Sequence, residues 1–177
     1  MNRIVTWITT SDQYAFQLIN QKLKCKLFDL ILPRITHLGG ATCTISFLLF
    51  IIMLSQSMLR LIAIKSLLSL ALSHLIVHII KKIYCRERPY VKLPDIQLGT
   101  HPLKDYSFPS GHTTAVFSIA IVFNLYSSPL SIILLPVAFL VGFSRMYLGL
   151  HYPTDCIIGA ILGTISSIMV YYIPIFG

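Results

Sequence analysis

A stretch of 39 residues, 106–144, contains no Asp, Glu, Lys or Arg, and no other feature restricts the fold of this chain as strongly. One helix needs ~20 apolar residues to cross a bilayer, so this stretch is long enough to cross and return. It predicts two membrane helices, at about 112–125 and 130–147, with a turn at 126–129. The polar residues at its two ends would then lie on the same side of the membrane.

The composition also indicates a membrane protein. Charged residues make up 11% of the chain, whereas soluble domains contain roughly 25%. The mean hydropathy is +0.78. A soluble helical protein would have to cover its surface with only six acidic and fourteen basic residues. We therefore predict an all-α fold: a polytopic membrane helix bundle of about five transmembrane helices.

Three further apolar segments supply the other predicted transmembrane helices: 40–55, 59–80 and 156–173. The complete bundle would occupy 40–173. Arg60 and Lys65, near the start of the second helix, could extend to the lipid headgroups. Gly159 and Gly163 form a GxxxG spacing in the last helix, which we interpret as close packing within the bundle.

Two polar segments flank these helices. Residues 1–34 mix basic and aromatic side chains, which is typical of one or two short amphipathic helices on the membrane surface. Ser11 or Asp12 could cap the first of them. Residues 83–106 contain three prolines, which predict a loop. This loop would lie on the membrane side where the two ends of 106–144 meet, which is the side of the candidate active site described below. No linker divides the chain, so 1–177 is expected to be one domain.

Five crossings would bring seven polar side chains to one membrane side: Lys81, Arg88, Ser110, His112, Arg145, His151 and Asp155. Among them only Asp155 is acidic, so the cations call for a polyanionic ligand. Arginine binds phosphate oxygens in a bidentate manner. The net charge of +8 could suit nucleic acid, but no nucleic-acid-binding motif is present. The phosphate of an anionic lipid is the favoured ligand.

The turn Pro109-Ser110-Gly111-His112 also suits phosphate. Ser110 could cap the helix that follows, and Gly111 would allow a ligand to approach the backbone. The free N–H groups and the positive end of the helix dipole would face the same ligand.

The two histidines predict a nucleophile and a general acid, because imidazole changes protonation near neutral pH. Pro153 suits the first position of the last helix, which puts Asp155 in its first turn. Asp155 could hold one nitrogen of His151 protonated and leave the other free to attack. His112 would protonate the leaving oxygen.

We predict no metal and no cofactor. The six acidic residues are scattered, and no two of them have the spacing for joint coordination of a divalent cation on one helix face. His74 and His78 share a helix face and could bind a metal together. No third ligand is spaced to join them, so packing or hydrogen bonding between helices is the favoured interpretation.

These residues together resemble the three-part signature of the type 2 phosphatidate phosphatase (lipid phosphate phosphatase) superfamily, in its bacterial integral-membrane branch. The three parts are Lys81-x6-Arg88-Pro89, Pro109-Ser110-Gly111-His112 and Ser144-Arg145-x5-His151-x3-Asp155. The resemblance implies metal-independent hydrolysis of phosphomonoesters or diphosphates through a phosphohistidine on His151. Asp155 would orient His151, and His112 would be the general acid. The resemblance implies five residues that grip the phosphoryl group: Lys81, Arg88, Ser110, Gly111 and Arg145.

The expected function is removal of a terminal phosphate from a membrane lipid, of the phosphatidylglycerophosphate, phosphatidate or undecaprenyl diphosphate type. Gly111 differs from the Asp found after Pro-Ser in some undecaprenyl diphosphate phosphatases, which weakens that last assignment. The alternative is a non-catalytic relative that binds or moves anionic lipids. The oligomeric state is left open.

Two arguments give opposite answers for the side of the membrane on which the site lies. Lysine and arginine lie overwhelmingly on the site side, with only Arg60 and Lys65 opposite, which by the positive-inside rule would place the site in the cytoplasm. The resemblance implies an extracytoplasmic site. We follow the resemblance and predict a multi-pass protein of the cell (plasma) membrane with an extracytoplasmic active site.

Overall fold

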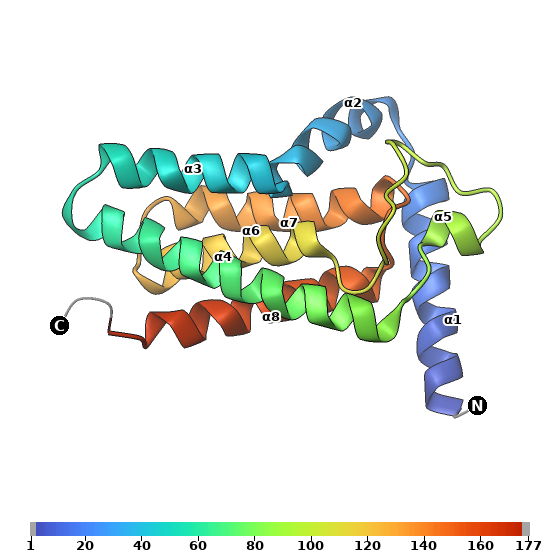
Figure 1. The fold of residues 1–177 in the computed structure, drawn as a ribbon. Coiled ribbons are helices and arrows are strands. Elements are labelled where there is room, and N and C mark those ends of the chain that lie inside the picture. The colour runs from blue at the N-terminus through green and yellow to red at the C-terminus, as the bar shows by residue number, and fades with distance from the viewer. Residues whose placement is uncertain (1–2, 175–177) are drawn as a thin grey trace.

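A computed structural model describes residues 3–174, and every regular element in that range is a helix. The longer elements are α1 (Arg3–Gln17), α2 (Lys26–Ile35), α3 (Ala41–Leu54), α4 (Ser57–Tyr84), α6 (Gly111–Leu125), α7 (Ser131–Tyr147) and α8 (Pro153–Tyr171). The shorter ones are a π-helical turn η1 (Leu18–Lys22), a 3-10 turn η2 (Thr36–Gly39) and α5 (Pro89–Lys92). Five helices, α3, α4, α6, α7 and α8, run side by side, and α1 crosses one end of the bundle (Figure 1).

These five helices lie where the sequence predicted apolar segments. Two of them are long and apolar enough to cross a membrane, within Ser57–Lys92 and Pro153–Tyr171. A third span is formed if Lys26–Gly39 and Ala41–Leu54, which meet at a bend of 60°, act as one. The helices α6 and α7 are apolar but have 15 and 17 residues, fewer than the ~20 that one crossing requires. The apolar helices support a membrane location, and five crossings stays a prediction.

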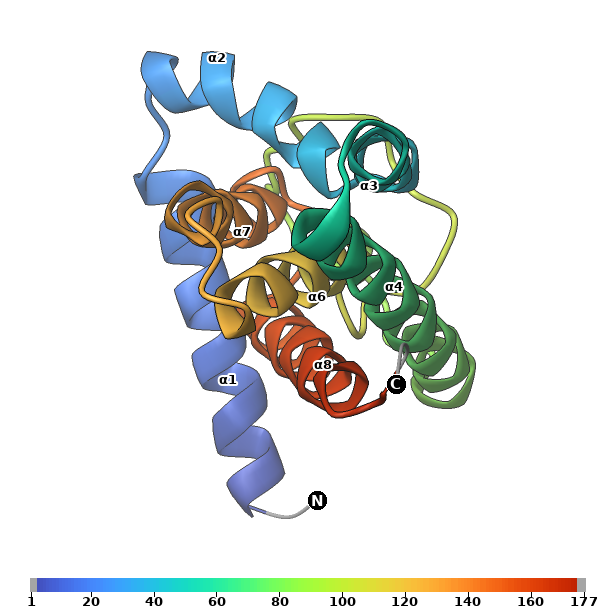
Figure 2. The ribbon, with the colours of Figure 1, turned by 90° about the vertical axis from the view of Figure 1, so that its left-hand side faces the viewer.

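Helix α6 lies at the centre, with α3, α4, α7 and α8 around it (Figure 2). Its contact with α8 depends on Gly159 and Gly163. A Cβ atom on Gly163 would lie 2.6 Å from the carbonyl oxygen of Thr114, and one on Gly159 would lie 2.7 Å from that of Ser110. The GxxxG spacing thus packs α8 against α6, as the sequence indicated, and this contact positions the beginning of α6.

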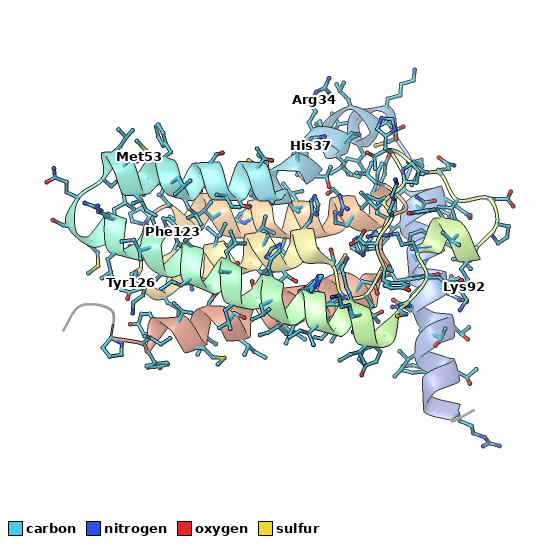
Figure 3. All side chains as sticks on the ribbon, viewed as in Figure 1. Arg34, His37, Met53, Lys92, Phe123 and Tyr126 are labelled. Carbon is cyan, nitrogen blue, oxygen red and sulfur yellow. The ribbon has the colours of Figure 1, made fainter. Side chains whose placement is uncertain are left out.

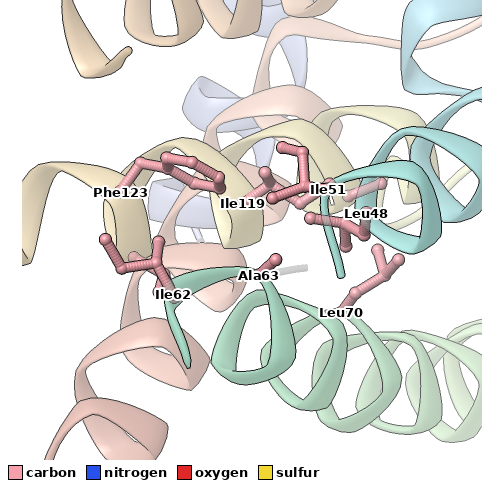
Figure 4. Packing of buried hydrophobic residues seen from close by; sticks show 9 residues of the cluster. Leu48, Ile51, Ile62, Ala63, Leu70, Ile119 and Phe123 are labelled. Carbon is pink, nitrogen blue, oxygen red and sulfur yellow. The ribbon is translucent and has the colours of Figure 1, made fainter. Parts of the chain in front are cut away.

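The largest of the three apolar clusters among the described residues lies toward the end of the bundle opposite α1, and another, which includes Tyr147 and Leu150, packs beside the site. In the largest cluster, Leu48 and Ile51 of α3 pack with Ile62 of α4 and Phe123 of α6 (Figure 4). In Figure 3, Met53 and Tyr126 lie near one end of the bundle and Lys92 near the other. Burial of apolar side chains stabilises both ends, including the end at which the polar site forms.

The prediction for Lys65 is wrong. Its side chain is buried, with 5% of the residue exposed, and its ammonium group binds within the protein. The ammonium group donates to the carbonyl oxygens of Tyr171 and Ile173 over 2.7 and 2.8 Å. The last carbonyl groups of a helix have no partners within the helix, so Lys65 of α4 satisfies the end of α8.

Candidate active site

The eight predicted site residues gather at the end of the bundle that α1 crosses. Lys81 lies in the last turn of α4, and Arg88 in the loop after it. Ser110, Gly111 and His112 begin α6, Arg145 ends α7, and His151 and Asp155 flank the beginning of α8. Two backbone hydrogen bonds connect these segments: Ser110 N donates to Asp155 O over 3.0 Å, and His151 N donates to Arg145 O over 3.2 Å.

His151 is 1% exposed and lies between Arg88 and Asp155. Nη1 of Arg88 lies 3.2 Å from its Nε2. A guanidinium group can only donate, so Nε2 accepts this hydrogen bond and the proton of the neutral ring is on Nδ1. Burial, followed by the charges of Arg88, Arg145 and Lys81, holds the pKa of His151 well below its usual 6.5. The ring is therefore neutral near pH 7, with the lone pair of Nε2 directed toward the cations.

Asp155 is fully buried at the beginning of α8. Its Oδ2 lies 3.5 Å from Nδ1 of His151, and no hydrogen bond to Nδ1 forms among the described residues. Oδ2 instead accepts from Ser107 Oγ and from Tyr152 N, the latter over 2.8 Å. The predicted contact between the carboxylate and the imidazole is thus present at ion-pair distance. Ser107 and the backbone set the direction of the carboxylate.

Asp105, which is not one of the predicted site residues, is a second acid near the cations. Its carboxylate accepts from Nζ of Lys81 over 2.5 Å and from Nη2 of Arg88 over 2.7 Å. Burial alone would raise the pKa of Asp105, but the hydrogen bond and charge of Lys81, together with Arg88, lower it to about 2. The carboxylate therefore stays ionised and bridges two of the predicted phosphate ligands.

Arg145 is 3% exposed, and Nη1 donates to Oγ1 of Thr36 in η2 over 2.8 Å. Its Nε and Nη2 are buried and have no hydrogen-bond partner among the residues described. Such donors are costly to bury unpaired. They fit an anion, and the bidentate geometry of guanidinium suits a phosphoryl group.

The beginning of α6 differs in part from the prediction. Ser110 occupies the N-cap position, but its hydroxyl group pairs with Thr113 Oγ1 over 2.9 Å and does not cap the helix. A Cβ on Gly111 would meet nothing nearer than Val77 Cγ1, at 4.0 Å. Glycine is thus not required here by contacts within the protein.

His112 lies in the first turn of α6 against η2. A Cβ on Gly39 would lie 3.0 Å from the carbonyl oxygen of His112, and one on Gly40 would lie 3.8 Å from Nε2. The two glycines therefore let η2 pass directly over this histidine. The ring is half-buried and lies near the guanidinium of Arg145 and the imidazole of His151.

Several residues of the site were missed in the sequence. Asp105 and Ser107 lie in the loop before the signature turn, and Thr36 and Asn20 lie before the first signature residue. Asn20 is fully buried and binds the backbone of both Gln97 and Tyr147. Each of these residues is polar within an apolar or loop segment, but nothing in their spacing indicates the partner.

Asp12 also differs from its prediction. It lies inside α1 and caps no end of that helix. Its Oδ1 accepts from the backbone N of Thr154 over 2.9 Å, and its Oδ2 accepts from Nη2 of Arg86 over 2.6 Å. The helix that it caps is therefore α8. Separately, no group of three or more His, Cys, Asp or Glu side chains arranged to hold a metal ion occurs within 3–174.

Solved structures of similar fold share this arrangement of helices. Aquifex aeolicus LpxE is 30% identical to this chain, with a TM-score of 0.82, over 90% of this chain and 94% of its own. A transmembrane PAP2-type phosphatidylglycerolphosphate phosphatase from Bacillus subtilis is 22% identical, with a TM-score of 0.76, over 93% of this chain and 84% of its own. At 22% identity, the similarity to the second structure shows a shared fold.

Curated relatives match a shorter part of the chain. The bacitracin transport permease protein BcrC of Bacillus licheniformis is 33% identical over 114 residues, which are 64% of this chain and 56% of the relative. An undecaprenyl-diphosphatase of Sulfolobus acidocaldarius is 32% identical over 112 residues, which are 62% and 54%. The matched part thus spans about half the length of these relatives. The model of the PAP2 superfamily matches residues 62–176, which include all eight predicted site residues. This chain belongs to the PAP2 superfamily.

Proposed function

We propose that this protein is a membrane lipid phosphatase. The observation that carries the proposal is the buried guanidinium of Arg145, with two donors unpaired among the described residues, close to Arg88 and the neutral imidazole of His151. A cationic pocket of this kind suits a phosphoryl group, and the imidazole supplies a nucleophile beside it. Membership in the PAP2 superfamily agrees with this chemistry.

The proposed reaction has two steps. Nε2 of His151 forms a bond to phosphorus while the bond from phosphorus to the lipid oxygen breaks, and His112 donates a proton to that oxygen. Water then attacks the phosphohistidine, His112 takes up a proton from it, and phosphate leaves with His151 restored. Asp155 stabilises the positive charge that develops on the imidazole. The phosphoryl oxygens are held by Lys81, Arg88, Arg145 and the backbone at Ser110 and Gly111.

The substrate class is a lipid phosphate with its headgroup at the membrane surface. Phosphatidylglycerophosphate, phosphatidate and undecaprenyl diphosphate are the proposed candidates. The relatives include a named undecaprenyl-diphosphatase, and the fold is that of a named phosphatidylglycerolphosphate phosphatase. The site holds the phosphoryl group through charge and backbone N–H groups, which do not distinguish these lipids.

The proposed topology has five crossings, by α3, α4, α6, α7 and α8, within one domain of residues 1–177. The segment 1–34 would lie on the membrane surface, the bundle would occupy 40–173, and the loop 83–106 would cover the active site. The backbone hydrogen bond from Ser107 N to Arg86 O, over 2.8 Å, holds the two ends of that loop together and supports the last assignment.

The site is proposed to face outward from the plasma membrane. Cys25 and Cys85 are both exposed, and Cys85 lies between Lys81 and Arg88. A variant with Cys85 as the sole cysteine should react with a membrane-impermeant maleimide in intact cells. A variant with only the buried Cys156 is the unreactive control. Labelling of Cys85 only after the membrane is opened would place the site in the cytoplasm.

The test of the function is phosphate release from the three lipids by the purified protein in detergent with EDTA present. We expect release from at least one lipid, and its loss in His151→Ala. His78→Ala, which changes an exposed histidine of α4, is the matched control. Dependence on a divalent metal, or activity in His151→Ala, would contradict the mechanism. Tight lipid binding without phosphate release would favour a non-catalytic protein that binds or moves anionic lipids.

A further inference from the structure

Arg86 joins the candidate active site to helix α1. It lies in the loop after α4, two residues before Arg88. Its Nη1 donates to Asp155 Oδ1 over 2.6 Å and to Thr154 Oγ1 over 2.8 Å. Its Nη2 donates to Asp12 Oδ2 over 2.6 Å. The guanidinium also stacks on Tyr152, with 4.1 Å between Cζ and the ring centroid. Neighbouring groups thus fix the guanidinium at its edge and on its face.

Asp12 holds Arg86 from the α1 side. It is 4% exposed, and it also accepts from the backbone N and from the hydroxyl group of Thr154, over 2.9 and 2.6 Å. Thr154 is in the first turn of α8, where N–H groups have no partner within the helix. Asp12, Arg86 and Thr154 therefore form a closed ring of hydrogen bonds that joins α1, the loop after α4 and the beginning of α8, and Arg86 connects this ring to Asp155.

The charge of Arg86 balances the charge of the Asp155 carboxylate. Asp155 has no exposed surface, and among residues 3–174 its ion-pair partners are Arg86 and His151. His151 is neutral, so Arg86 is the cation that balances the carboxylate. A buried carboxylate that loses its cation is strongly disfavoured and takes up a proton. A protonated Asp155 could no longer favour the tautomer of His151 that carries its proton on Nδ1.

The position of the contact matters as much as its charge. Arg86 binds Oδ1, whereas Ser107 and Tyr152 N bind Oδ2, the oxygen that faces His151. Because a carboxylate is planar, a fixed donor on each oxygen prevents its rotation about the Cβ–Cγ bond. Arg86 thereby keeps Oδ2 on the side of the imidazole.

We propose that Arg86 is a positioning residue, anchored by Asp12 of α1, that keeps Asp155 ionised and directed at His151. The inference rests on the proposed function for its kinetic readout, whereas its spectroscopic readout is independent of any turnover. It makes α1, which lies outside the lipid phosphatase signature, a part of the unit that prepares the nucleophile.

The kinetic experiment compares kcat and KM for Arg86→Gln, Arg86→Lys and Asp12→Asn. We expect kcat to fall about 10²-fold in Arg86→Gln with KM within about twofold, since Arg86 does not contact the phosphoryl site. Lysine can pair with Asp155 but cannot also bind Asp12, so Arg86→Lys should recover part of the loss. The control is Lys92→Gln. Lys92 and Arg86 line one surface pocket, and Asp155 is not among the residues that line it. Wild-type kcat in a folded Arg86→Gln variant would overturn the proposal.

The spectroscopic experiment measures the tautomer of His151 by NMR of protein labelled with ¹⁵N-histidine, with His151→Gln used to assign the signals. We expect a proton on Nδ1 in the wild type, where Arg88 donates to Nε2 and Asp155 faces Nδ1. In Arg86→Gln and Asp12→Asn the contact of Arg88 remains but the support from Asp155 is weakened, so the share of this tautomer should fall. The Asp12→Asn variant keeps the side-chain volume and serves if Arg86→Gln does not fold. If no lipid releases phosphate, the proposed function fails, while an unchanged tautomer in the variants would by itself refute the role of Arg86.

Discussion

Nη1 of Arg88 donates to Nε2 of His151 over 3.2 Å, so the proposed nucleophile is paired with one of the proposed phosphate ligands. The same nitrogen of Arg88 also donates to the carbonyl oxygen of Leu150 over 2.8 Å. A phosphoryl oxygen that takes over the donor of Arg88 would leave the lone pair of Nε2 free. In the proposed mechanism, substrate binding and release of the nucleophile are then one event.

Arg88→Lys should therefore lower kcat/KM by about 10²-fold. The guanidinium binds Asp105, Leu150 and His151 at once, and an ammonium group cannot reproduce this planar set. Each charged hydrogen bond that is lost contributes about 1.5–3 kcal/mol. Steady-state kinetics on the preferred lipid measures the change. Arg34→Lys is the control, since Arg34 is exposed and lies outside the site. A loss of less than threefold would show that charge alone is needed at residue 88.

Asp105→Asn should strengthen the binding of inorganic phosphate. The carboxylate pairs with Lys81 and Arg88, so it competes with a phosphoryl group for both cations and repels it. Removing one charge at this range corresponds to about 1–2 kcal/mol, or about tenfold in the inhibition constant of phosphate. Because the pKa of Asp105 is about 2, its own ionisation adds no pH dependence between pH 5 and pH 8, and any change in the difference over this range should follow the ionisation of phosphate. Weaker inhibition in the variant would mean that Asp105 serves to hold the cations in place.

The pH profile should reflect the low pKa of His151. The imidazole must be unprotonated to attack, and burial and the surrounding cations hold its pKa well below 6.5. The acid limb of kcat/KM, which reports the free enzyme, should therefore lie below pH 6.5 after correction for ionisation of the substrate. The sign for stability follows as well. His151 binds a proton near pH 6.5 in the unfolded chain but only at lower pH in the folded protein. The free energy of unfolding should therefore decrease as pH falls below about 6.5. An acid limb at pH 6.5 or above would contradict the burial of a neutral His151.

Gly163→Ala should destabilise the protein by about 1–3 kcal/mol, which a thermal melt in detergent measures. The added methyl group would lie 2.6 Å from Thr114 O and 2.8 Å from Ser118 N, both backbone atoms that cannot move alone. Gly111→Ala is the matched control substitution, because the added methyl group would lie 4.0 Å from Val77 Cγ1 and would clash with nothing. That variant should melt like the wild type while its KM for the lipid rises. Equal melting temperatures for the wild type, Gly163→Ala and Gly111→Ala would show that α6 and α8 can move apart without loss of stability.

Lys65→Met should lower the melting temperature and leave kcat nearly unchanged. The substitution removes the donor to Tyr171 O and Ile173 O at the end of α8, at a cost of about 1–3 kcal/mol. Arg60→Met is the control, because Arg60 is on the same helix and exposed. The two variants should differ in melting but not in activity. Lower activity in Lys65→Met at temperatures where it stays folded would mean that the two ends of α8 are coupled.

The sequence predicted most of the bundle and the identity of the motif residues, because both are local. The charge-free stretch marked α6 and α7, and Pro153 marked the beginning of α8. The spacing of Gly159 and Gly163 indicated a close contact, and the structure identifies α6 as the partner. Apolar length and the preference of proline for the first position of a helix depend on neighbours within a few residues, so they can be derived without knowledge of the fold. The side-chain caps predicted at Ser110 and Asp12 did not form, because both side chains bind other partners.

The polar partners could not be derived in this way. Lys65 was assigned to the headgroups because it lies near the start of an apolar helix, whereas its acceptors lie over a hundred positions later in the sequence. Asp105 was treated as a loop charge because its ion pair with Lys81 depends on how that loop folds back. Asp12 pairs with Thr154, 142 residues away. Single-residue chemistry suggests many partners for such groups, and only the packing of distant helices selects one.

The hydrogen bond from Arg145 to Thr36 bears on which part of the chain could work if moved to another protein. The region that matches the PAP2 superfamily is 62–176, and it contains every signature residue. A graft of that region would leave behind the hydroxyl group that holds Arg145 and the carboxylate of Asp12. The smallest portable unit is therefore larger than the signature, since it must also carry α1 and the turn that begins at Thr36.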